Sequence, residues 1–273
     1  MTLRSRTVLV NASLVAAAVV ALGPLVWMVS VSFMAPGEAS SSPPPLLPRV
    51  PTFENYRELL AQTRMGRGFI NSLLLATGAT LLALVFNVSA GYAFAKLRFA
   101  GRERLFRILL GALLIPAQVA MIPLFLLLKS MGLVNTYLGV LLPPAANIFG
   151  IFLVRQYALS IPDDLLEAAR IDGAGEVRLF WSIVLPVLGP ILVTLAIFTF
   201  LGSWNDFLWP LIVLTDDSRH TLPVALASLT REHVQDSELM MAGGVITVLP
   251  VLALFVVLQR YYIQGLLAGS IKG

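Results

Sequence analysis

The chain contains no cysteine among its 273 residues. This absence excludes disulfide frameworks, zinc–thiolate sites and cysteine nucleophiles. Charge is also scarce, because charged side chains make up only 12% of the residues while 58% are apolar. Soluble domains carry about twice that share of charge, so a soluble fold of this size would lack polar surface.

Other chemical signatures are missing as well. No G-x-x-x-x-G-K-[ST] loop is present to hold nucleotide phosphates, and no catalytic constellation is found. The only histidines, His220 and His233, fall in a polar segment where solvated side chains are the default. The net charge of +4 is scattered between apolar runs, which does not favour nucleic-acid binding. We expect no enzyme activity, no bound metal and no nucleic-acid partner.

Six apolar runs have about the length that crosses a membrane. A helix needs about 20 mostly apolar residues to cross a hydrocarbon core of about 30 Å. The fourth run is the weakest prediction because Pro143, Pro144 and Asn147 interrupt it. We therefore expect an all-α membrane protein with about six transmembrane helices, near Val8–Phe33, Phe69–Ala95, Leu105–Leu128, Leu138–Tyr157, Ile183–Leu214 and Leu239–Tyr262.

Basic residues indicate the orientation. The first run follows Arg4 and Arg6 as a secretory signal would, but it exceeds the usual signal core of about 7–15 residues, so a retained anchor is expected. Twelve of the 19 basic residues fall in the loops on one side of the runs, and such an excess marks the cytoplasm. Both termini, the turn Lys96–Arg107 and the loop 159–186 are therefore expected to be cytoplasmic.

The runs divide the chain into four parts. These are an anchor span over residues 1–34, an extracytoplasmic segment over 35–68, a core of about five spans over 69–262 that includes the loop 159–186, and a cytoplasmic tail over 263–273. Ala35–Pro51 is rich in proline and serine and should be extended rather than packed. Thr215–Glu238 is acidic and polar, with a stretch that could form a small helix.

The stretch SIPDDLLEAARIDG, Ser160–Gly173, carries the boundary signals of a short helix. Pro162 suits the first turn, acidic side chains follow it, and Gly173 fits just past the end, where a left-handed residue is often needed. Glu167 and Arg170 are three residues apart and could pair on the surface. Leu165, Ala168, Ala169 and Asp172 should share one side, and Glu176–Trp181 should form a second short helix before Pro186.

The same loop resembles a family signature. Glu-Ala-Ala, three residues, Gly, nine residues and Ile-x-Leu-Pro is the pattern of permease subunits in binding-protein-dependent ABC importers, and it occurs without departure at Glu167-Ala168-Ala169, Gly173 and Ile183-Val184-Leu185-Pro186. Further segments resemble the second permease subunit of maltose-type carbohydrate importers: FENY (Phe53–Tyr56), FINSL (Phe69–Leu73), SWNDFLWPLIVL (Ser203–Leu214), TLPVAL (Thr221–Leu226) and QRYYIQGLLAGSIKG (Gln259–Gly273).

The resemblance implies the type I permease fold of ABC importers, with a cytoplasmic coupling-helix loop. In that family the loop docks into the ATPase, and closure of the ATPase dimer on ATP switches the permease between inward-open and outward-open states. ATP and magnesium would be bound by the partner ATPase, and no cofactor by this chain. The coupling residues implied are Glu167, Ala168, Ala169, Asp172, Gly173, Ile183, Leu185 and Pro186.

The resemblance also implies partners and a location. They are a second permease subunit forming a heterodimer, a cytoplasmic ATPase dimer, an extracytoplasmic solute-binding protein and membrane lipid, in the cytoplasmic (inner) membrane of a bacterium or archaeon. In maltose-type relatives the C-terminal tail reaches the ATPase dimer interface. That role falls here on Gly265, Gly269, Lys272 and Gly273, and a frayed terminus is the alternative.

Polar side chains within spans are costly and are candidates for function. They are Asn71, Asn87, Asn147, Asn205 and Asp206. Trp204, Asn205 and Asp206 could line a translocation path, with Trp204 and Trp209 stacking on sugar rings; the alternative places this group at the outer interface, where tryptophan is enriched. In maltose-type systems the partner permease supplies most sugar contacts. Asn71 and Asn87 are expected to make hydrogen bonds between helices.

Three other functions remain open. One is an ABC importer permease for a solute other than a sugar. Another is a stand-alone secondary transporter, which would need its own coupling site, and Asp206 is the candidate for it. An intramembrane enzyme would need an embedded nucleophile and base, but no histidine lies in any of the six runs. The sequence does not identify the solute.

Overall fold

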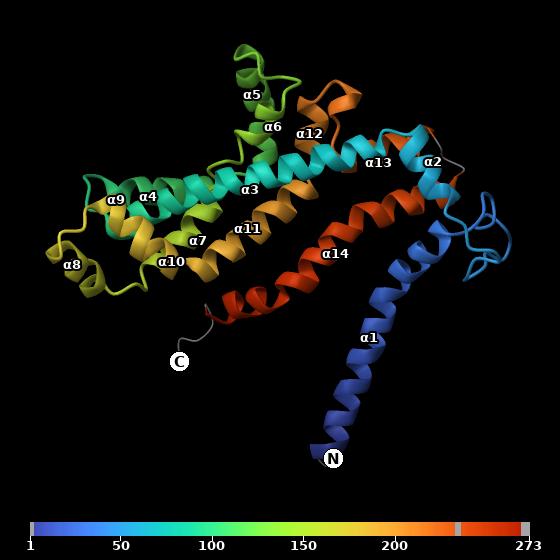
Figure 1. Ribbon diagram of the computed structural model, residues 1–273, viewed down its shortest axis with the longest axis horizontal. Helices are drawn as coiled ribbons and strands as arrows, with labels where there is room; N and C mark the ends of the chain where they lie inside the picture. The colour runs from blue at the N-terminus through green and yellow to red at the C-terminus, as the bar shows by residue number, and fades with distance from the viewer. Residues whose placement is uncertain (1–2, 233–235, 269–273) are drawn as a thin grey trace. The chain divides into compact units, whose positions relative to one another are not determined.

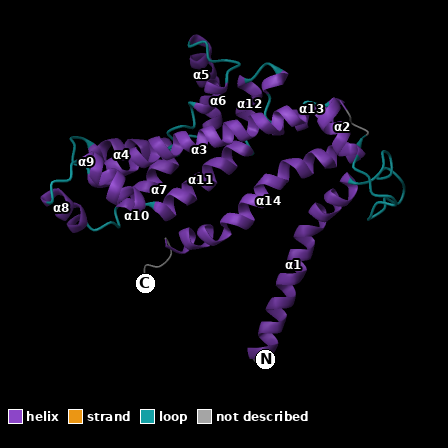
Figure 2. Cartoon of the chain, in the orientation of Figure 1, coloured by secondary structure: helices purple, strands orange, loops and turns teal. Residues whose placement is uncertain are grey.

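The computed structural model describes residues 3–232 and 236–268, and within these ranges the chain is helical with no strand (Figures 1 and 2). The α-helices are α1 Leu3–Ser32, α2 Glu54–Gln62, α3 Met65–Lys96, α4 Arg102–Ala112, α5 Ala117–Ser130, α6 Tyr137–Leu141, α7 Ile148–Ala158, α8 Asp163–Ile171, α9 Glu176–Leu179, α10 Leu185–Val187, α11 Gly189–Trp204, α12 Leu208–Val213, α13 Leu222–Glu232 and α14 Ser237–Ala268. A π-helical segment spans Phe180–Val184, and a 3₁₀ turn spans Asp217–Arg219.

The chain divides into two compact units. Among the described residues, 3–68 with 222–232 and 236–250 form the first, and 69–221 with 251–268 form the second. In the first unit, the buried Asn55 amide of α2 donates hydrogen bonds to the carbonyls of Ser32 (3.0 Å) and Met34 (2.8 Å) at the end of α1. Since a helix end leaves carbonyls without partners, these bonds fix where α1 stops. The small helix expected within 215–238 is present as α13.

The proline-rich segment 35–51 differs in part from its prediction. It forms no regular helix, as expected. It is nevertheless tied down, because the Ala39 N–H donates to the buried Glu238 carboxylate at 2.7 Å and the Arg49 N–H donates to Glu38 at 2.8 Å. Most of the segment is exposed, as expected for one that is not packed, but its anchoring was not foreseen, because composition does not reveal an acceptor 199 residues away in the chain.

The second unit packs α3, α7 and α11 around a shared apolar core. Its buried members come from α3, α7, α8 and the α9–α11 segment and include Tyr92, Val154, Leu166 and Leu195. The helices α3 and α7 approach closely: a Cβ added to Gly91 would lie 2.6 Å from Val154, and one added to Gly150 would lie 2.5 Å from Asn87 Nδ2. Small residues permit such contacts between membrane helices.

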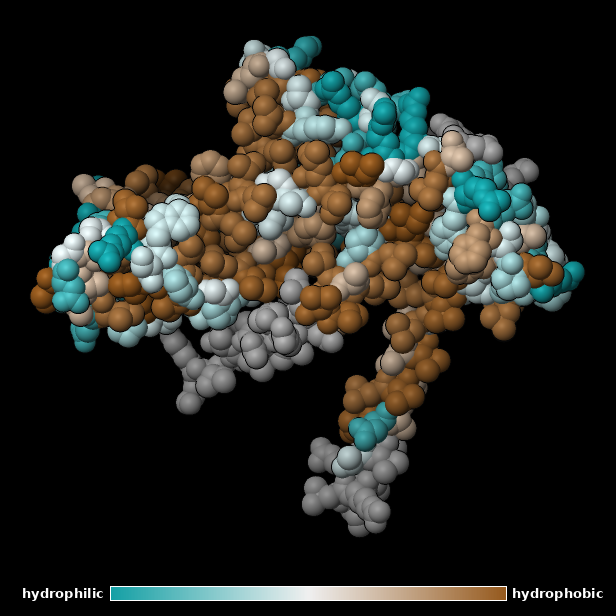
Figure 3. Space-filling model, in the orientation of Figure 1, coloured by the Kyte–Doolittle hydropathy of each residue, from teal (hydrophilic) through white to brown (hydrophobic). Residues whose placement is uncertain are grey.

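Within this unit, α8 and α12 lie at opposite ends of α11 (Figure 1). Apolar surface covers α3 and α11 between those ends, and hydrophilic side chains gather around α8 and around α12 (Figure 3). This distribution is typical of helices that cross a membrane between two aqueous faces.

The number of continuous spans is smaller than the sequence predicts. Three helices are long and apolar enough to cross a membrane, Val10–Ser32, Met65–Lys96 and Ser237–Val257. Two further pairs would bring the total to five if each bent pair is one span: α4 with α5, bent by 103°, and Glu176–Val187 with α11, bent by 77°. The fourth expected span is divided into the short helices α6 and α7. Six uninterrupted spans are thus not found in the described chain.

Proline accounts for the interruptions. Pro116 precedes α5 directly, and Pro143 and Pro144 separate α6 from α7; a proline ring has no N–H and disfavours helix at the residue before it. The turns before Pro186 widen into the π-helical segment, which contains Ser182, the residue that would have accepted the missing bond. These signals are visible in the sequence, but the apolar runs conceal their effect.

Candidate coupling loop and membrane pocket

The helix α8 begins where the sequence signals place it. It starts at Asp163, with Pro162 as the residue before the first turn and Asp163 and Asp164 within it. Acidic side chains at this end interact favourably with the positive end of the helix dipole. Pro162 was expected within the first turn, but it directly precedes that turn, in extended backbone with φ −60° and ψ 133°.

The C-terminal end of α8 is closed by a Schellman motif. Gly173 has φ +84°, the Gly173 N–H donates to the Arg170 carbonyl, and the Ala174 N–H donates to the Ala169 carbonyl, both at 3.0 Å. These two bonds satisfy carbonyls that a helix end would leave unpaired. The left-handed residue predicted at Gly173 is therefore confirmed, and it makes the turn toward α9 definite rather than loose.

One face of α8 is anchored in the core of the second unit. Leu166 is 1% exposed and belongs to the buried cluster, and Ala169 packs against the same cluster. Beside this contact, the Lys96 ammonium at the end of α3 lies 2.6 Å from the Asp163 carboxylate and donates to the Ile161 carbonyl, also at 2.6 Å. The hydrogen bond and charge of Lys96 lower the pKa of Asp163. The buried side chain of Leu166 and the pair between Lys96 and Asp163 therefore both hold α8 against the rest of the second unit.

Arg170 has a different partner from the one predicted. Its guanidinium pairs with Glu176 at the start of α9, at 2.8 Å and 3.4 Å, rather than with Glu167. Tyr92 of α3 also donates to Glu176, at 3.4 Å. The positive-φ turn at Gly173 brings α9 back beside α8, and this reversal could not be read from helical spacing alone.

The opposite face of α8 is exposed. Glu167, Ala168 and Asp172 lie on it, and Ile171 is 86% exposed. Of the four residues expected to share one side, Leu165, Ala168 and Asp172 are exposed, whereas Ala169 is half-buried. The loop therefore presents an apolar and acidic surface on a helix whose other face is held in the core.

The second half of the signature lies where this loop joins α11. Ile183 and Leu185 pack against the same core cluster as Leu166. Pro186 is exposed in the short helix α10, directly before the 77° bend into α11. The signature residues thus include one set on the surface and one set at the base of the span.

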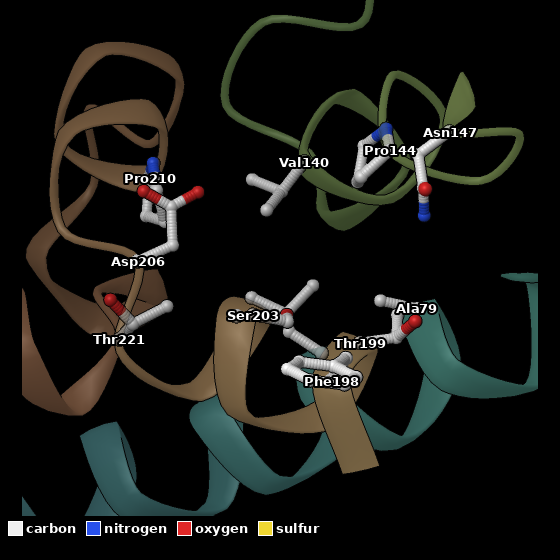
Figure 4. A pocket seen from close by; sticks show the side chains of 12 residues that line it. Ala79, Val140, Pro144, Asn147, Phe198, Thr199, Ser203, Asp206, Pro210 and Thr221 are labelled. Atoms are coloured by element: carbon white, nitrogen blue, oxygen red, sulfur yellow. The ribbon is translucent and has the colours of Figure 1, made fainter. Parts of the chain in front are cut away.

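A pocket of about 260 Å³ lies at the other end of α11 (Figure 4). Asp206 lines it, and one carboxylate oxygen accepts the Trp209 N–H at 3.3 Å, capping α12. Trp204 is fully buried, stacked on Phe200 at 5.8 Å between ring centroids. Asn205 is exposed and donates to the Leu201 carbonyl at 2.9 Å. Of these three predicted path residues, only Asp206 lines this pocket.

Trp209 is also buried, and its indole N–H donates to the Gly139 carbonyl at 3.2 Å. Both tryptophans therefore pack within the second unit. Asn71 and Asn87 differ. Asn71 donates to the Ser218 and His220 carbonyls and accepts from the Tyr137 hydroxyl, whereas neither polar atom of the buried Asn87 amide has a partner among the described residues. The predicted hydrogen bond between helices is confirmed for Asn71, which joins α3 to Tyr137 of α6, and is not found for Asn87 in the described chain.

Two other predictions fall at the edge of the described chain. Gly265 lies within α14, while Gly269, Lys272 and Gly273 lie outside the described residues, as does His233. The His220 ring nitrogen Nε2 lies 3.1 Å from the Leu214 carbonyl. No cluster of three or more His, Cys, Asp or Glu side chains suited to a metal occurs in the part of the chain that the structure describes.

Comparisons with known proteins match this geometry to a family. The profile described as binding-protein-dependent transport system inner membrane component matches residues 84–267, which include α8 and its whole signature. The chain belongs to this family. It is a permease subunit of an ABC importer, a multi-pass component of the inner membrane.

Curated relatives of this permease carry carbohydrate names. The arabinooligosaccharides transport system permease protein AraQ of Halalkalibacterium halodurans is 38% identical and covers 94% of this chain and 93% of its own length. The diacetylchitobiose uptake system permease protein NgcG of Streptomyces coelicolor is 35% identical and covers 96% and 86%. The resemblance to carbohydrate ABC importer permeases is thereby confirmed.

A solved structure supports the fold. A crystal structure of a bacterial ABC transporter involved in the import of the acidic polysaccharide alginate contains a chain with a TM-score of 0.85 to this permease, at 26% identity, covering 96% of this chain and 99% of that one. The broken helices described above therefore belong to an ABC importer permease fold.

Sequence reasoning missed several residues that shape the two sites. Lys96, Tyr92 and Glu176 hold α8 in place. Of these, Lys96 had a usable signal, because a lone cation at the end of a long apolar run needs an acceptor nearby. Thr221 in the pocket had only the family resemblance of TLPVAL as a signal, since a hydroxyl is unremarkable in a polar segment.

Proposed function

We propose that this permease is the transmembrane subunit of an ATP-driven sugar importer, forming half of the translocation path and coupling ATPase closure to alternating access. The observation that carries this proposal is the two-sided helix α8. Ile171, Ala168 and Glu167 are exposed on one face, while Leu166 on the other face is buried in the core shared by α3, α7 and α11. A load on the exposed face would therefore reach the spans directly.

The stiffness of α8 supports this role. Both ends are defined, one by Pro162 and the acidic first turn and the other by the Schellman bonds at Gly173. Pairs from Lys96 to Asp163 and from Arg170 to Glu176 hold the helix against its neighbours. A flexible loop would absorb a displacement, whereas a capped and anchored helix transmits it.

The docking surface would be formed by Glu167, Ala168 and Asp172 on α8. Ala169, Ile183 and Leu185 would connect it to the core, while Gly173 and Pro186 would set the turns on either side. The C-terminal residues Gly265, Gly269, Lys272 and Gly273 would contact the ATPase dimer. The excess of basic residues on this side supports a cytoplasmic position for the loop and both termini. The bent pairs, with α6 and α7, would complete about six crossings once partner subunits surround them.

Partners complete the importer. An ABC permease subunit works with a second permease, an ATPase and a solute-binding protein, and here we propose a heterodimer with an ATPase dimer. ATP and magnesium would be bound by the ATPase. Carbohydrate permeases among the relatives support a sugar as the solute, with Asp206, Asn205 and Trp204 near or along its path.

Crosslinking tests the coupling role directly. Because the chain has no cysteine, an Ala168→Cys variant carries one thiol, on the exposed face of α8. In the assembled complex we expect this thiol to crosslink to a nucleotide-hydrolysing subunit, and the yield should change when ATP is added. Ser130→Cys, exposed at the end of α5, is the matched control and should give no such product.

Two results would contradict the proposal. One is the recovery of no ATPase with Ala168→Cys while the complex still imports its solute. The other is uptake by the isolated chain in liposomes that is driven by an ion gradient and does not require ATP, which would identify a secondary transporter instead.

A further inference from the structure

The pocket of about 260 Å³ at the end of α11 is lined by several polar side chains, although the helices around it are mostly apolar. Its lining comes from α3, α6, the α6–α7 connection, α11, α12 and the segment after the 3₁₀ turn (Figure 4). Five of its side chains can form hydrogen bonds and the others are apolar or glycine. The polar five are Asn147, Thr199, Ser203, Asp206 and Thr221.

Thr221 is the group that most needs a partner. Its side chain lines the pocket and is 2% exposed, yet its hydroxyl oxygen makes no hydrogen bond within the described chain. Burying an unpaired hydroxyl is unfavourable, and nearly all such groups in native proteins are satisfied by protein, water or ligand. The pocket is the space from which a partner for Thr221 could come.

Two other pocket side chains have spare hydrogen-bonding capacity. The Asp206 carboxylate accepts the Trp209 N–H, and an ionised carboxylate has about four acceptor sites, more than the backbone donors at the start of α12 occupy. Asn147 uses its amide oxygen for the Gly150 N–H at 2.6 Å, which leaves an NH₂ group with two donors. Acceptors and donors therefore face the same space, in the pattern that binds a ligand with several hydroxyls.

The apolar part of the lining suits the same kind of ligand. Phe198, Val140, Pro144 and Pro210 lie among the polar groups (Figure 4). A sugar ring has hydroxyls around its edge and C–H groups on its faces, so it needs both kinds of surface. Small-molecule sites generally combine an apolar lining with a few placed polar groups.

Charge and size narrow the ligand further. The lining contains one carboxylate and no Lys, Arg or His, so an anionic solute would meet repulsion without a counter-charge. A calcium ion takes six to eight oxygen ligands, usually with several carboxylates, which this site does not provide. The volume lies below the ~300–1,000 Å³ of sites for drug-sized ligands, which limits the occupant to about one ring.

We propose that this pocket binds a single neutral sugar ring of the transported solute, with Thr221 and Asp206 hydrogen bonding to its hydroxyls. The proposal rests on the importer function above and adds that this subunit itself, and not only its partner permease, contacts the sugar. The pocket lies beside Leu75 and Ala79 of α3, roughly 25–32 Å along that helix from Lys96, which contacts α8.

A thiol-protection experiment tests this site. Ser203→Cys places the chain's only thiol in the pocket, and Ser130→Cys is the control outside it. The complex is reconstituted in liposomes and reacted with methyl methanethiosulfonate, a small neutral reagent, alone or with arabinose, N-acetylglucosamine, arabinobiose or diacetylchitobiose. At least one sugar should slow the labelling of Ser203→Cys severalfold and leave that of Ser130→Cys unchanged.

A second variant assigns the hydroxyl. Adding Thr221→Val to Ser203→Cys should weaken the protecting sugar's apparent affinity about two- to tenfold, the loss of one neutral hydrogen bond, and Thr221→Ser should retain it. Thr194→Val is the matched control, because Thr194 is buried on the same unit but donates to the Pro190 carbonyl at 3.1 Å and does not line the pocket.

The inference is overturned if no sugar of the panel protects Ser203→Cys, or if Thr221→Val leaves the protection intact. It is also overturned if sodium chloride, used in place of choline chloride, protects Ser203→Cys without sugar, because that result would identify a cation site. A failure of the coupling role would show separately, as the absence of the ATP-sensitive crosslink at Ala168→Cys. The two proposals can therefore fail independently.

Discussion

The coupling loop and the pocket lie at opposite ends of α11 and treat polar groups in opposite ways. In the loop, Asp163, Arg170 and Glu176 each have a charged partner, and two backbone hydrogen bonds close the C-terminal end of α8. In the pocket, the buried Thr221 hydroxyl has no hydrogen-bond partner among the described residues, and the Asp206 carboxylate caps α12 while it keeps acceptor capacity. Complete pairing makes a region rigid, whereas an unpaired buried group leaves a hydrogen bond for a ligand to form.

The difference separates two tasks within one subunit. The loop needs a single shape, since its proposed work is to transmit displacement without bending. The pocket needs unused hydrogen-bonding capacity, since its proposed work is to hold a solute briefly and release it. Variants placed at the two ends should therefore fail in different ways, and that contrast can be measured.

The largest effect is expected from Gly173→Val. The φ of +84° is strained for any residue with a Cβ and most for a β-branched one, by about 1–2 kcal/mol or more, and the Schellman turn should be lost. Uptake should fall at least about tenfold while the protein remains in the membrane. Uptake of the labelled solute into cells, normalised to membrane protein, is the measurement.

Gly175→Val is the matched control for that variant. Gly175 has φ −70°, and neither glycine has an atom within 4 Å of an added Cβ, so the two changes differ in backbone strain and not in available space. Near-normal uptake by Gly175→Val is expected. Equal uptake by both variants would remove the argument that a fixed turn after α8 is needed.

Glu167→Lys, on the exposed face of α8, should also abolish uptake while the protein remains in the membrane.

The next effect is expected from Leu166→Ala. Leu166 is 1% exposed, so its truncation leaves a cavity and should cost about 2–5 kcal/mol of stability. If α8 transmits force through this contact, the complex should still hydrolyse ATP while moving less solute per ATP. The ratio of uptake to hydrolysis in proteoliposomes, together with Tm, measures both consequences.

Its control is the neighbouring side chain. Leu165 is 43% exposed, and Leu165→Ala should change stability by no more than about 0.5 kcal/mol. A normal ratio of uptake to hydrolysis in Leu166→Ala would show that the buried face of α8 does not carry the coupling.

The sequence predicted the features that depend on neighbouring residues, and it did not predict those that depend on contacts between separate elements. Local rules were sufficient for α8, since the acidic first turn and Gly173 act through backbone groups a few residues away. Contacts between helices were not accessible: the pairing of Arg170 with Glu176 depends on the turn between two helices, and the burial of Trp204 depends on Phe69 of α3 against it. The Asp206 pocket joins segments more than 100 residues apart, which no local pattern shows.

Two asparagines on α3 sharpen the contrast with a smaller effect. Asn71 bonds to the Ser218 and His220 carbonyls, directly before the pocket residue Thr221, whereas Asn87 is 0% exposed and has no hydrogen-bond partner within the described chain. Asn71→Leu leaves buried acceptors unsatisfied and should cost about 1–3 kcal/mol. Asn87→Leu, of similar shape, should leave Tm unchanged or raise it. A marked loss of stability in Asn87→Leu would show that water or a partner satisfies this amide.

The smallest effect is expected from Asp163→Asn, which removes the charged partner of Lys96. Lys96 keeps the Ile161 carbonyl as an acceptor, and Asp163 itself is exposed, so Tm of the complex should fall only slightly.

The pH dependence of the stability that this ion pair contributes has a definite sign, because Lys96 lowers the folded-state pKa of Asp163 below its ordinary value. The contribution is therefore complete above the ordinary aspartate pKa of about 4 and is lost only as the pH falls through the lower folded-state pKa. The Tm difference between wild type and Asp163→Asn should accordingly stay constant between about pH 7 and pH 5. A difference that shrinks within that range would mean that Asp163 titrates near neutrality, and the anchor between α3 and α8 would then be weaker at the pH where the importer works.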